Sequence, residues 1–190
     1  MKTAIILHGM PDKESYLDSS KDSQSNSHWF PWLQQQLNVR GILTQTPEMP
    51  EPYNPVYEAW KKVFEQFTLN EDTTLVGHSC GAGFIVKYLS ETPNIKVGKV
   101  VLVAPWINPL KEFVVTIFDG LQVDPELVKK TKGVTVFTST NDERDVIESA
   151  AILAEKVQGI KTVEFKDYGH FCFGDMKTRE FPELLEEVIQ

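Results

Sequence analysis

The sequence predicts an α/β fold: a single-domain, three-layer α/β/α sandwich over residues 1–190, built on a parallel six-stranded sheet. Six short aliphatic runs alternate with segments whose apolar residues recur at helical spacing. The runs are short and mainly apolar, as strands are when helices cover both of their faces. A length of 190 residues with 41% hydrophobic residues suits one domain with a substantial core.

The elements follow from these patterns and from turn residues. Strands are predicted over residues 2–7, 41–44, 73–77, 97–104, 133–139 and 162–166. Helices are predicted over residues 28–37, 55–67, 81–90, 144–157 and 181–189, with Asn54 as the cap of the second and Pro55 at its first position. Right-handed crossovers favour the strand order 2-1-3-4-5-6. That order has a switch point between strands 1 and 3, beyond whose carboxyl ends ligands bind.

Two connections are long enough to gate a site at that edge. Residues 10–27 are polar and exceed the usual length of a strand-to-helix loop, so we expect a functional or mobile loop. Residues 106–132 contain apolar residues over 113–121 that would form an amphipathic helix, either in the core or as a lid. Some aromatic residues are candidates for an apolar pocket, although core packing is favoured for most of them: Phe84, Trp106, Phe113, Phe118, Phe171 and Phe173.

Charge and cysteine content exclude several classes of partner. The net charge of −8 and the pI near 5.0 argue against nucleic acid and anionic membrane surfaces. The apolar run near the N-terminus is too short for a secretory or membrane-spanning segment, so we expect a cytoplasmic protein. The two cysteines, Cys80 and Cys172, form no Cys-x-x-Cys pair, which argues against a zinc site or a disulfide scaffold.

The candidate nucleophile is Ser79, in the segment Gly77-His78-Ser79-Cys80-Gly81. This Gly-x-Ser-x-Gly pattern lies between a predicted strand and a predicted helix, which is the context of a nucleophile elbow. In such an elbow the serine occupies a sharp, strained turn, and side chains two positions to either side would collide. The turn exposes the hydroxyl to a substrate.

The candidate base is His170. A serine hydroxyl needs a neighbouring base to remove its proton. Of the four histidines, His170 follows the last predicted strand, as the chain order serine, acid, histidine requires.

The candidate acid is Asp142, which directly follows the fifth predicted strand and would orient the imidazole. The alternative role for Asp142 is a helix N-cap. Asp145 is expected inside the next helix, and Asp167 is a weaker rival that we expect to be a solvated loop charge.

Backbone amides are the expected partners of the oxyanion that attack on a carbonyl creates. The residue after the nucleophile supplies one, here Cys80, and the loop after the first strand supplies the other, for which Met10 is the candidate. The segment lacks the Gly-Lys-Ser/Thr ending of a phosphate loop, and it does not match Gly-x-Gly-x-x-Gly. No spacing of histidines or carboxylates suggests a metal, so we expect neither a metal nor a cofactor.

Taken together, these motifs resemble the small serine hydrolases of the α/β-hydrolase superfamily that are similar to retinoblastoma-binding protein 9. The resemblance covers nearly the whole chain and rests on five segments: Ile6-Leu7-His8-Gly9, His28-Trp29-Phe30-Pro31-Trp32, Gly77 to Gly81, Asn141-Asp142 and Gly169-His170-Phe171. It implies a minimal hydrolase sheet without the two leading antiparallel strands, and Ser79, Asp142 and His170 as the triad. The pocket-protein motif Leu-x-Cys-x-Glu does not carry over, because His78 and His170 stand where its leucine would precede each cysteine.

The expected activity is hydrolysis of a small carboxylic ester, thioester or amide through an acyl-Ser79 intermediate. Two other hypotheses use the same fold. One is a non-catalytic protein-binding module, since a fold does not guarantee a function. The other is acyl transfer to an acceptor other than water.

Overall fold

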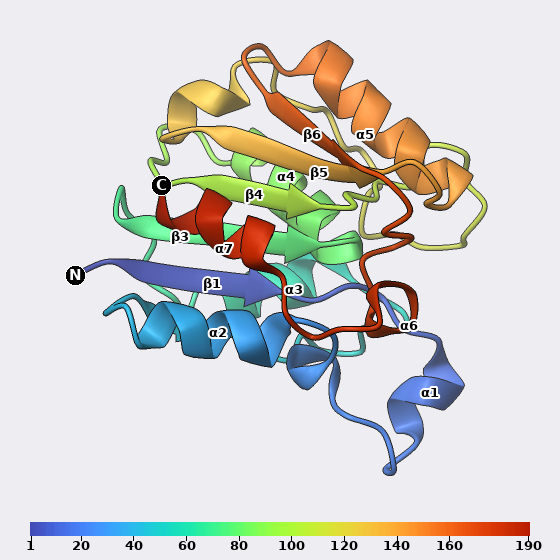
Figure 1. Cartoon of the computed structure of the whole chain (residues 1–190). Coiled ribbons are helices and arrows are strands. Elements are labelled where there is room, and N and C mark those ends of the chain that lie inside the picture. Colours follow the sequence, from blue (N-terminus) through green and yellow to red (C-terminus); the bar gives the residue numbers. More distant parts are fainter.

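The sheet has six parallel strands in the order β2-β1-β3-β4-β5-β6 in the computed structural model, which describes residues 1–190 (Figure 1). The number and the order of the strands match the prediction. All five pairings between neighbouring strands are parallel. The strands span Thr3–Leu7 (β1), Leu43–Gln45 (β2), Thr73–His78 (β3), Val100–Val103 (β4), Val134–Ser139 (β5) and Lys161–Phe165 (β6).

Helices cover both faces of this sheet and complete the predicted sandwich. They span Lys13–Leu17 (α1), Phe30–Asn38 (α2), Tyr57–Phe64 (α3), Cys80–Glu91 (α4), Arg144–Lys156 (α5), Phe173–Met176 (α6) and Pro182–Ile189 (α7). In Figure 1, α2 and α7 lie in front of the sheet, whereas α3 and α4 lie behind it. The carboxyl ends of β1 and β3 point to the same edge, where the chain leaves β1 for α1 and β3 for α4.

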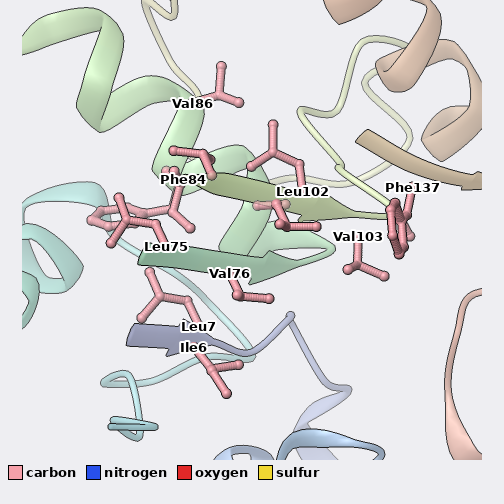
Figure 2. Packing of buried hydrophobic residues seen from close by; sticks show 14 of the residues in the cluster. Ile6, Leu7, Leu75, Val76, Phe84, Val86, Leu102, Val103 and Phe137 are labelled. Carbon is pink, nitrogen blue, oxygen red and sulfur yellow. The ribbon is translucent and has the colours of Figure 1, made fainter. Parts of the chain in front are cut away.

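Burial explains why the central strands are aliphatic. Every residue of β4 is buried, and so are four of the five residues of β1. Ile6 of β1 and Val76 of β3 are register partners on one face of the sheet, whereas Leu102 of β4 packs on the other face (Figure 2). The edge strand β6 is mostly exposed, and it accordingly carries Lys161 and Glu164. A strand that is covered on both faces has the apolar surface of both faces removed from water. This burial is the main stabilising contribution of the layer.

The connection over residues 10–27 contains short structure that the sequence analysis did not predict. Helix α1 has Asp12 as its N-cap, whose Oδ1 accepts a hydrogen bond from the Ser15 amide at 2.8 Å. A turn of 3-10 helix follows at Gln24–Asn26. No residue of α1 is buried. The helix therefore lacks the apolar periodicity from which a helix is predicted in a sequence.

The amphipathic helix suggested for residues 113–121 is wrong. This stretch consists of turns, and regular structure returns only with a 3-10 helix at Leu127–Lys130. The reason lies in the buried Lys87 of α4, whose Nζ donates to the carbonyl oxygens of Ile117 at 3.1 Å and Asp119 at 2.7 Å. Ile117 and Phe118 are buried all the same, so the segment packs on the core without being helical.

The predicted cap of α3 is also wrong. The helix begins at Tyr57, and its N-cap position is Val56, with φ −113° and ψ 123°. Asn54 and Pro55 therefore lie before the helix, in the extended, proline-rich connection. The apolar face itself is as expected, because Tyr57, Trp60 and Phe64 are buried, with their rings packed on Phe84 of α4.

The predicted aromatic set divides between core and surface. Phe84 and Phe171 are fully buried, and Phe118 is nearly so. Trp106 and Phe113 line a cavity that is described below, and Phe173 is exposed. None of the helices combines the length and the apolar character that a membrane crossing needs.

Candidate active site

Ser79 occupies the turn between β3 and α4 in a strained backbone conformation. Its φ of 54° and ψ of −121° lie outside the regions that a serine ordinarily adopts. The flanking glycines make the turn possible: a Cβ on Gly77 would lie 2.5 Å from Ala82 Cα, and one on Gly81 would lie 2.4 Å from the His8 carbonyl oxygen. This is the elbow geometry that the sequence predicts, held in place by backbone contacts.

His170 and Asp142 meet across the loops that follow β6 and β5. His170 Nδ1 lies 2.8 Å from Asp142 Oδ1. The Asp142 side chain is fully buried, while that of His170 is 24% exposed. Because the carboxylate accepts the Nδ1 proton, the unprotonated Nε2 of a neutral His170 is free to act as a base.

The structure does not show Asp142 as a helix N-cap or Asp167 as the partner of His170. The N-cap position of α5 is Glu143, so Asp142 lies one residue before it, although its Oδ1 also accepts the Glu143 amide at 2.7 Å. Asp167 is exposed, and its carboxylate has no hydrogen-bond partner. Asp145 lies within α5, as expected.

Ser79 and His170 line two cavities that adjoin at the carboxyl edge of the sheet. The larger has a volume of about 350 Å³ and the smaller about 240 Å³, and Met10, Pro11 and Asp12 also line both of them. Ser79 Oγ makes no hydrogen bond in the structure. Bonds between a nucleophile and its base are often longer in structures without substrate, so the shared cavities are the informative observation.

The backbone amides of Met10 and Cys80, which lie at this edge, make no hydrogen bond within the protein. Cys80 is the first residue of α4, so its N–H is one of the amides that an α-helix leaves unpaired at its N-terminus. The Cys80 thiol itself is fully buried, and burial raises its pKa. Burial likewise raises the pKa of Cys172 to about 12, so neither thiol is a nucleophile near neutral pH.

The other three histidines make hydrogen bonds to the main chain around the site. His8 Nδ1 donates to the Gly9 carbonyl oxygen and His8 Nε2 accepts the Met49 amide, each at 2.8 Å. His78 Nε2 donates at 2.8 Å to the carbonyl oxygen of His170 and so positions the loop that carries the candidate base. The sequence analysis missed this contact because it joins residues that are 92 positions apart.

Another missed residue is Asp145, which is almost fully buried at the start of α5. Its carboxylate accepts hydrogen bonds from Trp106 Nε1 and from the Leu110 amide, the latter at 2.8 Å. The neighbouring Ser149 Oγ accepts the Ile107 amide at 3.1 Å. Helix α5 therefore fixes Trp106, which forms part of the cavity wall. The available signal in the sequence was an acid in the first turn of a predicted helix.

Burial of uncharged histidines leads to a prediction about stability. Burial lowers the pKa of His28 to about 4, and it lowers the pKa of His78 well below its ordinary value. In the unfolded chain a histidine has a pKa of about 6.5. As the pH falls below about 6.5, these histidines become protonated in the unfolded chain before they do so in the folded protein. The free energy of unfolding therefore decreases as the pH falls, whereas above about pH 6.5 it is unaffected by these groups.

We expect His28→Gln to be less sensitive to acid than the wild type. Glutamine lacks the titration but can still accept the Phe173 amide that His28 Nδ1 accepts at 3.2 Å. Between pH 7 and pH 5, the free energy of unfolding of the wild type should fall by about 2 kcal/mol more than that of the variant. Urea denaturation at the two pH values measures this, and equal falls would contradict the assignment of His28 as a half-buried neutral group.

The fold is that of an α/β-hydrolase, and the comparisons with known proteins agree. The family model for serine hydrolases matches residues 19–185, so the chain belongs to the serine hydrolase family and is a hydrolase. YdeN of Bacillus subtilis (strain 168), a hydrolase by name, is 29% identical over 168 residues, which are 84% of this chain and 86% of YdeN.

Solved structures show the same likeness. The crystal structure of the B. subtilis ydeN gene product superposes with a TM-score of 0.80 at 25% identity, covering 98% of this chain and 96% of that one. Est1E from Butyrivibrio proteoclasticus has a TM-score of 0.63 at 16% identity, with 100% and 89% coverage. The methylesterase MES16 from Arabidopsis has a TM-score of 0.63 at 12% identity, with 100% and 99% coverage. The last two share the fold with this chain.

Proposed function

We propose that this protein hydrolyses small carboxylic esters, thioesters or amides through an acyl-Ser79 intermediate, with Ser79, His170 and Asp142 as a triad. The observation that carries the proposal is the His170–Asp142 hydrogen bond beside the cavities that Ser79 lines. A serine on a strained turn, a base whose other nitrogen is bound to a buried carboxylate, and a cavity between them are the parts that acyl transfer needs.

In the first half of the reaction, His170 Nε2 takes the proton of Ser79 Oγ as the oxygen attacks the carbonyl carbon. The tetrahedral oxyanion is stabilised by the amides of Met10 and Cys80, whose lack of internal partners supports this role. His170 then donates its proton to the leaving group, and the carbon–heteroatom bond breaks. Asp142 stays ionised and stabilises the imidazolium.

In the second half, water attacks the acyl-enzyme and gives its proton to His170. Collapse of the second tetrahedral intermediate releases the carboxylic acid, and the proton returns to Ser79 Oγ. The chemistry balances with water as the sole co-substrate. No cofactor takes part in these steps.

A fluorophosphonate probe tests the proposal. We expect stoichiometric labelling of Ser79 in the wild type and none in Ser79→Ala, together with turnover of members of a p-nitrophenyl ester and thioester panel. Labelling of the alanine variant would overturn the assignment of the nucleophile. Absence of both labelling and turnover would favour the binding-module hypothesis. Product analysis with competing alcohols and amines distinguishes hydrolysis from acyl transfer.

A further inference from the structure

The larger cavity beside Ser79 has an aromatic wall. Tyr53, Trp106 and Phe113 line it together with Met10, Pro11 and Val146. The rings of Trp106 and Phe113 are nearly perpendicular, at 84°, with their centroids 5.3 Å apart. Trp106 is held in place by Asp145, so this corner of the cavity exists before a substrate arrives.

The charged residues of this cavity are acidic. Asp12 and Glu143 line it, and no lysine or arginine does. Hydrogen bonds from Ser15 lower the pKa of Asp12, so this carboxylate stays ionised. Glu143 forms no ion pair, and its carboxylate accepts no hydrogen bond, so its charge has no counter-ion from the protein.

Two lysines lie near this wall without lining the cavity: Lys13, whose Nζ lies over the Tyr53 ring at 5.3 Å from the centroid, and Lys21, whose charge also lowers the pKa of Asp12. An ammonium group of the protein thus lies within cation–π distance of one ring of this wall. Both lysines lie outside the lining, so the charged side chains that form the cavity wall itself are the two carboxylates.

We propose that this cavity binds a positively charged group of the substrate, an alkylammonium carried on the ester, thioester or amide that Ser79 attacks. The inference rests on the proposed function and names the substrate class for it. The faces of aromatic rings attract a cation, and the two carboxylates add a longer-range attraction. A volume of about 350 Å³ accommodates a head group of the size of trimethylammonium. The same wall repels a carboxylate at that position.

The experiment compares esters that have the same shape and differ in charge. On the alcohol side the pair is choline butyrate and neohexyl butyrate, in which a carbon atom replaces the nitrogen. On the acyl side the pair is the p-nitrophenyl ester of γ-trimethylammoniobutyrate and its carbon analogue. One of the two parts of the ester, the alcohol or the acyl group, occupies the cavity. For the pair that varies this part, we expect kcat/KM of the cationic ester to exceed that of the neutral ester by about tenfold at low ionic strength.

Variants of the two carboxylates assign the effect to this wall. In Asp12→Asn the asparagine still accepts the Ser15 amide as an N-cap, so α1 keeps its cap. We expect the cationic-to-neutral ratio of kcat/KM to fall to about twofold in Asp12→Asn/Glu143→Gln, and to fall with added salt in the wild type. The matched control is Glu14→Gln/Glu148→Gln, which removes two carboxylates outside the cavity and should leave the ratio unchanged.

Binding to Ser79→Ala separates this inference from the proposed function. Calorimetry with the unhydrolysed esters should show tighter binding of the cationic member of one pair. If the wild type cleaves none of the esters while Ser79→Ala retains that preference, the proposed function is wrong and the cation site stands. If the wild type cleaves neutral esters at least as fast as cationic ones, and Ser79→Ala shows no preference, the cation site is wrong and the proposed function stands.

Discussion

Replacing His170 with alanine is expected to lower kcat by about 10⁴- to 10⁶-fold, because the members of a nucleophile–base pair act as a unit. The substitution removes the base, and it also leaves the buried Asp142 carboxylate without the partner at 2.8 Å. Steady-state kinetics on the best p-nitrophenyl ester of the panel measure the loss, and the rate of fluorophosphonate labelling should fall with it.

His28→Gln is the matched control for this variant, since His28 lines the smaller cavity together with His170. It takes no part in the proposed proton transfers, so we expect its kcat to stay within about tenfold of the wild type, well short of the loss that removal of a general base causes. Urea denaturation shows whether either variant has lost its fold. Activity of His170→Ala within tenfold of the wild type would contradict its role as the base.

Replacing Asp142 with asparagine is the second large effect, with an expected loss in kcat of about 10⁴-fold at neutral pH. The side chain keeps its shape and stays in its buried position. An amide in place of the carboxylate can stabilise the wrong tautomer of His170, with the proton on Nε2, and it no longer stabilises the imidazolium. The change in kcat, measured with KM, distinguishes this electrostatic loss from weaker substrate binding.

The matched control is Asp167→Asn, which removes the other carboxylate considered for the acid. Asp167 is exposed and lies in the loop that carries His170. We expect its kcat to equal that of the wild type. A loss in Asp167→Asn together with full activity in Asp142→Asn would reverse the assignment of the acid.

The sheet could be predicted from sequence because burial on both faces leaves a strong compositional signal. The run Val100–Val103 is aliphatic throughout and is buried throughout. The ends of the strands can also be recognised from turn residues, and Ser79, Asp142 and His170 each lie after the end of a strand. The proposed triad could therefore be assigned from the order of strand ends without knowledge of distances.

The parts that could not be predicted depend on contacts between distant residues. The path of residues 113–121 follows from Lys87, which binds two carbonyl oxygens of that segment from another element. The contact of His78 with the His170 carbonyl oxygen, and that of Asp145 with Trp106, likewise join separate elements. Local periodicity contains no information on such pairs.

Helix α4 lies so close to the segment around Trp106 that main-chain contacts hold the position of the nucleophile relative to the cavity wall. A Cβ on Gly83 would lie 2.0 Å from the Trp106 carbonyl oxygen, and the Trp106 amide donates to the Ser79 carbonyl oxygen at 3.2 Å. The turn that carries the nucleophile and the wall beside it are thus joined main chain to main chain. The half-exposed Phe113 can therefore be exchanged without displacing Ser79, whereas Trp106 is also the donor to the buried Asp145. A laboratory or an evolving lineage can retarget this protein by changing Phe113 while its reactive centre stays in register.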